Sequence, residues 1–217
     1  MGTLFLSGGG NARQTSRLDG IFAKTIKKHK RLLYIPIAMP ESEHTFGACF
    51  DWIRKALGPH DISKIDMWVD LAGRSQTELD RYGAVYIGGG NAYHLLDAIR
   101  GSGFDRLLLG YLRAGGIVYG GSAGAIILGK DIGTTSDRNL TGTGNLRGLN
   151  VVNGYSVRCH YTTKDDGELR NYVKRKRIGV LALPENSGIV LDKGAIRSVG
   201  VVYEFTIRGS GVEKRRV

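Results

Sequence analysis

Short apolar runs alternate with longer stretches of helical periodicity along the first part of the chain. Runs rich in β-branched and aromatic residues predict strands at 3–7, 32–38, 65–71, 84–88 and 117–120. The spacing of apolar residues between and after these runs predicts helices at 15–30, 41–57, 92–100 and 104–114 and from Ala123 onward. Strands that are apolar almost throughout and alternate with helices are typical of a parallel sheet buried on both faces. We therefore predict an α/β fold of three layers, in which helices cover both faces of a mostly parallel sheet.

The pattern changes after residue 131. The segment 131–148, DIGTTSDRNLTGTGNLRG, is rich in Gly, Thr and Asn and predicts a long irregular loop, a feature that is often functional in a compact domain. A strand near 155–161 and a helix near 166–175 follow. Four more short runs, VLALP, GIVLD, AIRSVG and VVYEFTI, predict strands that we expect at a hairpin-rich edge of the same sheet. No linker or repeat array interrupts this order, so we predict one domain over 1–217.

Composition and charge limit where in the cell the protein is expected and which kinds of partner it is expected to bind. The 217 residues are 41% hydrophobic and 24% charged, and no run approaches the roughly 18 apolar residues that a membrane span needs. The first residues lead directly into a strand without a basic segment, so we expect a cytoplasmic protein. The formal net charge is +11, and the basic residues cluster at predicted helix ends and at the chain terminus, at 27–31, 174–177 and 214–216. Cations at such places stay solvated and no nucleic-acid-binding motif accompanies them, so we expect neither nucleic acid nor membrane as a partner.

The glycine-rich turns do not match a phosphate-binding loop. A dinucleotide fingerprint requires G-x-G-x-x-G, but Arg13 and Tyr93 occupy its last glycine position after the first and fourth predicted strands. A near-match to Walker A ends in Asp131, where a Ser or Thr would hold magnesium. The two cysteines, Cys49 and Cys159, have neither the spacing of metal ligands nor that of a disulfide framework. We expect no metal and no other cofactor.

One of these turns carries a serine. The stretch IVYGGSAGAIIL at 117–128 places G-x-S-x-G between a predicted strand and a predicted helix, as a nucleophile elbow requires. The helix that begins at Ala123 would direct free N–H groups and its positive dipole end toward Ser122, where they could stabilise an oxyanion. The same pattern is also satisfied by a structural turn in which Ser122 only caps the helix. The motif alone leaves both interpretations open.

A nucleophilic serine needs a base and an acid that orients the base. Of the five histidines, His29 and His60 are expected at the surface, and His44 and His94 lie at helical positions. His160 closes the strand-like run YSVRCHY, and functional groups of an open α/β sheet gather at strand ends. Two acids are candidates for the third member of the set, Glu185 in the turn after VLALP and Asp137 in the long loop. The pattern does not choose between them.

The order of these motifs resembles the peptidase E family. The matching segments are GGGN-x-x-x-LL, GGSAGA, TTSD, CHY and LPEN, at 88–96, 120–125, 134–137, 159–161 and 183–186. Members of this family are serine peptidases that cleave aspartyl dipeptides, and cyanophycinase is a relative. The resemblance implies a fold similar to class I glutamine amidotransferase domains, with a serine in place of their cysteine. It also implies that 1–217 is a single catalytic domain.

The resemblance further implies roles for individual residues. Ser122 is similar to the family's nucleophile, His160 to its general base and Glu185 to its acid. The backbone N–H groups of Gly90 and Ala123 would form the oxyanion hole. Asp137 and Asn91 are candidate accessory residues, and Arg170 is a candidate partner for a substrate carboxylate. Gly121 departs from the better-known members, which carry a bulky aromatic residue before the serine.

Our leading hypothesis is a serine hydrolase of short peptides, a dipeptidase with a preference for an amino-terminal Asp or related acidic residue. Its partner would be a small peptide substrate, and its candidate assembly is a homodimer. One alternative is a family member that has lost turnover and acts as a binding or sensing protein. A second is a small esterase with the chain order Ser122, Asp137, His160, which the short chain and the missing HGGG-type loop disfavour.

Overall fold

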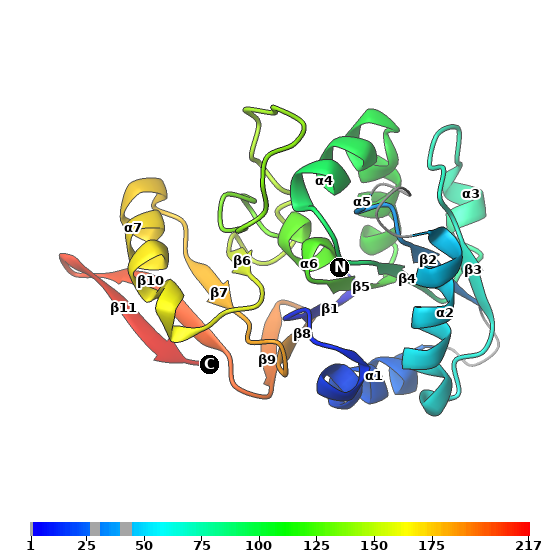
Figure 1. Cartoon of the computed structure of the whole chain (residues 1–217), viewed down its shortest axis with the longest axis horizontal. Coiled ribbons are helices and arrows are strands. Elements are labelled where there is room, and N and C mark those ends of the chain that lie inside the picture. The colour runs from blue at the N-terminus through cyan, green and yellow to red at the C-terminus, as the bar shows by residue number, and fades with distance from the viewer. Residues whose placement is uncertain (1, 27–30, 40–44) are drawn as a thin grey trace.

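A mostly parallel sheet forms the middle of the molecule (Figure 1). The computed structural model describes residues 2–26, 31–39 and 45–217. Within them, seven strands pair in the order β3-β2-β4-β5-β1-β8-β9. Their bounds are Thr3–Ser7 (β1), Leu32–Ile35 (β2), Ile65–Met67 (β3), Ala84–Ile87 (β4), Ile117–Gly121 (β5), Gly188–Asp192 (β8) and Ala195–Val199 (β9). The first five are parallel, whereas β8 and β9 add an antiparallel edge.

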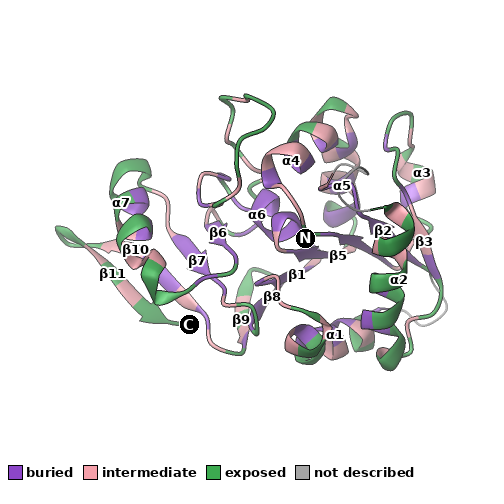
Figure 2. Cartoon of the chain, viewed as in Figure 1, coloured by how far each residue is buried: buried purple, intermediate pink, exposed green. Residues whose placement is uncertain are grey.

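Helices cover both faces of this sheet. They are α1 (Ala12–Thr25), α2 (Phe46–Leu57), α3 (Gln76–Leu79), α4 (Ala92–Gly101), α5 (Phe104–Arg113), α6 (Ala123–Leu128) and, outside the sheet, α7 (Asp166–Lys176), with 3-10 turns at Gly58–His60 and Thr163–Asp165. Buried strands lie between exposed outer helix surfaces (Figure 2). The predicted three-layer α/β fold is confirmed.

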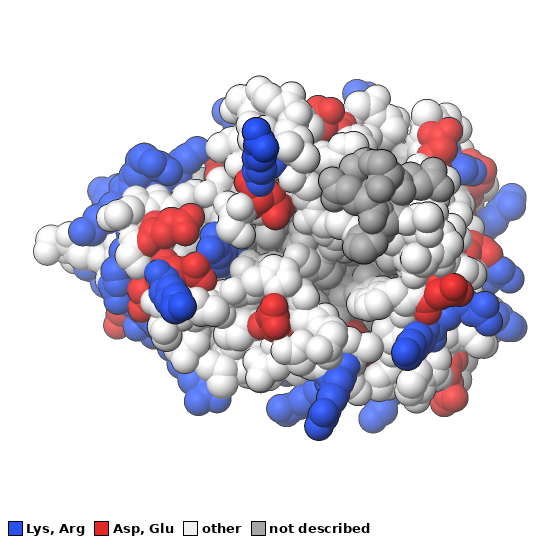
Figure 3. Space-filling model, viewed as in Figure 1, with Lys and Arg blue, Asp and Glu red and all other residues white. Residues whose placement is uncertain are grey.

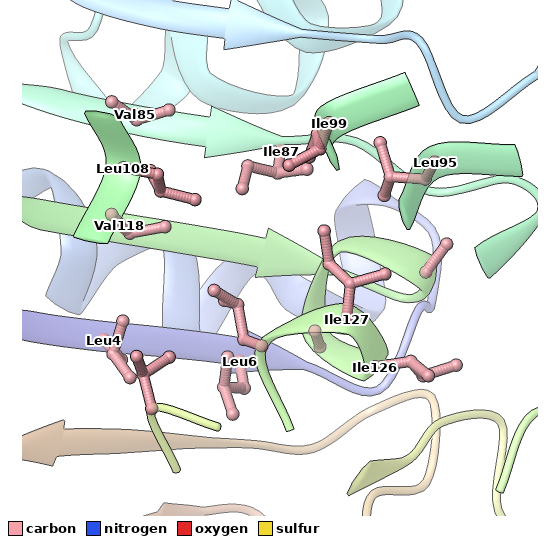
Figure 4. Close-up of a cluster of buried hydrophobic side chains, with 14 of the residues drawn as sticks. Leu4, Leu6, Val85, Ile87, Leu95, Ile99, Leu108, Val118, Ile126 and Ile127 are labelled. Carbon is pink, nitrogen blue, oxygen red and sulfur yellow. The ribbon is translucent and has the colours of Figure 1, made fainter. Parts of the chain in front are cut away.

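Alternate residues of each central strand enter two different cores. From β1, Leu4 and Leu6 pack with side chains of α4, α5 and α6 (Figure 4). Phe5 points to the other face, where it contacts Phe22 of α1 with ring centroids 5.2 Å apart. This alternation follows from the two-residue repeat of a strand. Because β1, β4 and β5 run parallel, their carboxyl ends lie at one edge of the sheet, where polar turns of the chain gather.

The prediction that all C-terminal strands join the same sheet is wrong. Only β8 and β9 do so. The others form a separate four-stranded sheet in the order β11-β10-β7-β6, with bounds Ser156–Arg158 (β6), Val180–Ala182 (β7), Tyr203–Arg208 (β10) and Gly211–Arg216 (β11). Helix α7 packs on this sheet through its own apolar cluster, which includes Leu169, Val173 and Phe205. A period-two pattern shows that a segment is a strand, but not which sheet it joins.

Other boundaries differ from prediction by a few residues. Helix α1 begins three residues early because Asn11 caps it, and the predicted strand 65–71 is regular only over Ile65–Met67. The segment 131–148 is irregular apart from one bridge between Asp131 and Arg147, as predicted. The predictions for His29, His44 and most of the basic cluster at 27–31 lie outside the described residues. No helix within the described ranges is long and apolar enough to cross a membrane.

Candidate active site

Ser122 sits in a strained turn between β5 and α6. Its backbone has φ 49° and ψ −112°, a conformation that L-residues rarely adopt. Close approach explains the small neighbours: a Cβ on Gly120 would lie 2.6 Å from the backbone of Gly124, and one on Gly124 would lie 2.4 Å from the carbonyl oxygen of Ile87. The serine side chain makes no capping hydrogen bond to the helix. The turn therefore has the geometry of a nucleophile elbow rather than that of a simple cap.

A chain of hydrogen bonds joins the three residues that the motif order predicted. Ser122 Oγ lies 2.8 Å from His160 Nε2, and His160 Nδ1 lies 3.1 Å from Glu185 Oε1. His160 follows β6 with φ 52°, and its backbone N–H donates to the carbonyl of Gly8 at 2.9 Å. Glu185 lies in the turn between β7 and β8. Three residues that follow β5, β6 and β7 thus meet at one place in the structure.

Glu185 is held in its ionised form. Its pKa lies below the ordinary glutamate value because His160 and then Gln14 hydrogen-bond to it. Gln14 Nε2 donates to Glu185 Oε2 at 3.2 Å, while its Oε1 accepts from the backbone N–H of the helix cap Asn11. Nothing in the sequence motifs singled out Gln14. The sequence feature that could have identified Gln14 is the capping box N-x-x-Q at the start of α1. Its glutamine faces the turn that holds Glu185.

The first glycine turn, 8–11, also forms part of this site. Gly9 has φ 96°, and a Cβ built on it would lie 2.5 Å from the imidazole of His160 and 2.9 Å from Ser122 Cβ. Glycine is therefore required there both by conformation and by space. The repeated tetrapeptide GGGN at 8–11 and 88–91 was the available signal, because the two copies follow β1 and β4, the strands on either side of β5, and reach the serine at the end of β5.

The second glycine turn, 88–91, approaches Ser122 from β4. A Cβ on Gly89 would lie 3.2 Å from Ser122 Cβ. Gly90 has φ 137°, and a Cβ there would meet Met39 at 2.4 Å. Within the described residues, the N–H groups of Gly90 and Ala123 donate to no other group. Both are therefore free to donate to a bound oxyanion.

Asp137 and Asn91 fasten the long loop to α4. Asp137 Oδ2 accepts from the backbone N–H of Ala92 at 2.7 Å, and Asn91 Nδ2 donates to the carbonyl of Arg138 at 2.8 Å. Asn91 Oδ1 also caps the first turn of α4. The carboxylate that reaches His160 is that of Glu185, so the order Ser122, Asp137, His160 of an esterase does not describe the geometry.

Arg170 lies away from Ser122. Its guanidinium donates to the carbonyl of Val212 and lies 5.9 Å from the centre of the Phe205 ring, on the second sheet. The candidate pairing of Arg170 with a substrate carboxylate at the serine is therefore not what the structure shows. Among the described residues, no cluster of three or more His, Cys, Asp or Glu side chains is placed to hold a metal ion.

Comparison with known proteins agrees with this arrangement. The model of peptidase family S51 matches residues 4–199, nearly the whole chain. The chain belongs to peptidase family S51. It is therefore a serine-type peptidase, and the predicted resemblance to peptidase E is confirmed.

Curated relatives of this S51 peptidase include a peptidase E and an uncharacterized peptidase. It is 28% identical over 172 residues to peptidase E of Streptomyces coelicolor, covering 75% of this chain and 68% of that protein. It is 29% identical over 159 residues to the uncharacterized peptidase Lmo0363 of Listeria monocytogenes, covering 69% and 75%. Both matches are long enough to include the elbow region.

Two crystal structures share its fold. A candidate peptidase E protein from Listeria monocytogenes EGD-e superposes with a TM-score of 0.67 at 24% identity, covering 100% of this chain and 99% of that one. A peptidase from an acI-B1 Actinobacterium gives a TM-score of 0.71 at 16% identity, covering 99% and 94%. At these identities the two structures support the fold.

The surface around the serine is hollowed. A cavity of about 360 Å³ opens beside Ser122, and its lining also includes Gly9, Gly89 and Gly121. On the face drawn in Figure 3, the depression near the centre lies between α1, α2 and α4, and the described side chains around it are mainly uncharged. The serine of this S51 peptidase is thus open to a small ligand.

Proposed function

We propose that this S51 peptidase hydrolyses the amide bond of short peptides through an acyl-enzyme formed on Ser122, with His160 and Glu185 completing the triad. The observation that carries the proposal is the continuous hydrogen-bond chain from Ser122 Oγ through the imidazole of His160 to Glu185, built on a strained turn. A serine hydroxyl is a weak nucleophile until a positioned base takes its proton.

The geometry supports a specific catalytic role for each of these residues. Ser122 Oγ attacks the carbonyl carbon while His160 Nε2 accepts its proton, and Glu185 orients the imidazole and stabilises the imidazolium. The N–H groups of Gly90 and Ala123 bind the oxyanion of the tetrahedral intermediate. His160 then protonates the leaving amine, the C–N bond breaks and the acyl group remains on Ser122. Water, deprotonated by His160, attacks the ester, and the acid product leaves with the serine restored.

Solvent exposure fits the release of an amine. The side chains of His160 and Glu185 are 46% and 51% exposed, so the leaving amine and the incoming water have open access to the base. The acyl side of the substrate instead faces the cavity beside Ser122. The family resemblance implies a dipeptide with an acidic amino-terminal residue, and dipeptides are the first substrates to test.

The test is turnover by Ser122→Ala beside wild type on a dipeptide panel. Removing the nucleophile of a triad costs about a thousandfold or more in kcat, and we expect a loss of that size. Ser198→Ala is the matched control, because that serine lies on β9 and bonds to the carbonyl of Val217. Ser122→Ala that retains wild-type turnover would reject the mechanism. Wild type that cleaves none of the peptides would favour the alternative of a binding protein.

A further inference from the structure

The walls of the cavity beside Ser122 are largely aromatic and apolar. The larger side chains that line it are those of Tyr34, Met39, Trp52 and Tyr86, and the remaining lining residues are small. Trp52 is 40% exposed, so its ring lies where the cavity meets the solvent. The indole stands edge-on to Tyr86, with ring centroids 6.4 Å apart.

The aromatic wall is preorganised. Tyr86 stacks on Tyr119 with centroids 4.3 Å apart and meets Tyr34 edge-on at 5.7 Å. Both Tyr34 and Tyr86 are buried to within a few per cent, so their rings are fixed by packing before any ligand arrives. A rigid pocket gains affinity because little conformational freedom is lost on binding.

Gly121 keeps the cavity open. A Cβ built on this residue would lie 3.2 Å from the hydroxyl of Tyr86, so any larger side chain at 121 would extend into the cavity. The residue immediately before the nucleophile thus sets how large a substrate side chain the cavity can hold.

The described residues that line the cavity include no Lys, Arg or His. An acid lies behind the wall: Thr15, a lining residue, donates its hydroxyl to Asp19 at 2.7 Å. Tyrosine hydroxyls supply hydrogen bonds but no positive charge. A substrate carboxylate placed here would lose its hydration without gaining a counter-ion from the described lining residues, which is strongly unfavourable.

We propose that this cavity receives the side chain of the residue whose carbonyl is attacked, and that the favoured side chain is apolar or aromatic rather than acidic. This rests on the proposed function. Ser122 lies in the wall of the cavity whereas His160 does not, so the acyl residue bonded to Ser122 enters the cavity. The leaving amine must lie beside His160 Nε2, outside it.

A series of dipeptides X-Ala tests the proposal, with X being Phe, Leu, Ala, Asp or Lys and the leaving residue constant. A hydrophobic pocket discriminates by about tenfold or more between a large apolar side chain and a small one, so kcat/KM for Phe and Leu should exceed that for Ala by at least this factor. Asp should fall below Ala. A flat profile, or one in which Asp is the best substrate, would overturn the proposal.

Two variants test whether the preference for an apolar substrate side chain depends on this cavity. Gly121→Leu fills the space, and Trp52→Ala removes the exposed ring at the mouth without touching the elbow. Each should lower the ratio of kcat/KM for Phe-Ala to that for Ala-Ala. Val69→Ala is the control, because Val69 is 42% exposed and lies outside this cavity. A ratio unchanged in both variants would contradict the assignment.

Labelling of Ser122 with a fluorophosphonate separates failure of this inference from failure of the proposed function. If Ser122 is labelled and Phe and Leu are preferred, both stand. If Ser122 is labelled and Asp is preferred, or the profile is flat, the inference fails and the function stands. If Ser122 is not labelled, the proposed function fails and the inference falls with it.

Discussion

Gly9 and His160 are in closer contact than any side chain at position 9 would allow. A Cβ on Gly9 would lie 2.5 Å from His160 Nε2, the same nitrogen that bonds to Ser122 Oγ. Such a distance cannot be relieved by rotating a flexible tip, because the imidazole is held from its other side by Glu185. The first strand of the sheet therefore fixes the position of the base.

Gly9→Ala should consequently displace the imidazole and lower kcat by about a hundredfold or more, as small misplacements of catalytic groups do. Gly115→Ala is the control for the effect of the positive φ. Gly115 has φ 91°, close to the 96° of Gly9, but a Cβ added to it would lie in open space. Gly9→Ala should lose at least as much stability in thermal unfolding as Gly115→Ala, because the clash with His160 adds to the backbone strain, but only Gly9→Ala should lose turnover. Equal activities of the two variants would contradict a role for this contact.

Replacing Glu185 and Asp137 in turn should lower kcat to different extents. Glu185→Gln removes the negative charge beside His160 Nδ1, and loss of the triad acid costs up to about 10⁴-fold in kcat. Asp137→Asn should change kcat little, because an asparagine oxygen can still accept the hydrogen bond from the N–H of Ala92. Steady-state kinetics of the two variants decide the question, and a larger loss in Asp137→Asn would refute the assignment of Glu185.

Gln14 should act through the charge state of Glu185. The pKa of Glu185 is lowered first by His160 and then by Gln14. Gln14→Leu should therefore raise the pH at which the Glu185 carboxyl titrates, as followed by carbon NMR. Because the folded pKa lies below the unfolded value, the stabilising effect of these bonds is complete above the unfolded pKa and is lost as the pH falls through the folded pKa.

The control is Gln76→Leu, since Gln76 makes a similar amide-to-carboxylate bond, to Asp80, on α3. Its removal should leave the titration of Glu185 unchanged. An unaltered Glu185 titration in Gln14→Leu would show that Gln14 only caps α1.

Cys49 offers a chemical probe of the cavity. It lines the cavity and is half-buried, whereas Cys159 is 3% exposed, so N-ethylmaleimide should modify Cys49 first. Burial raises the pKa of the Cys49 thiol, so less thiolate is present at neutral pH than for a free cysteine, and the reaction should accelerate as the pH rises. Modification should abolish turnover of Phe-Ala, and Cys49→Ala should be resistant. Full activity after complete modification would argue against substrate entering this cavity.

The sequence predicted which residues meet beside Ser122 better than it predicted the contacts around them. Ser122, His160 and Glu185 could be proposed because each lies in a short motif at the end of a strand and the motifs come in a recognisable order. Gly9 and Gln14 also lie in local motifs, but those motifs do not reveal their contacts with His160 and Glu185, which depend on β1 lying between β5 and β8. The position of Arg170 could not be predicted for a similar reason. Its helix packs on a second sheet, and strand periodicity does not distinguish that sheet from the first.

Covalent labelling at Ser122 tests the central claim most directly. A fluorophosphonate reacts with a serine whose proton a neighbouring base removes, so mass spectrometry of the wild-type protein should find one adduct, on the peptide that contains Ser122. His160→Gln should label far more slowly, and Ser198→Ala should label like wild type. An unmodified Ser122 in the wild-type protein, or equal labelling of wild type and His160→Gln, would contradict the account.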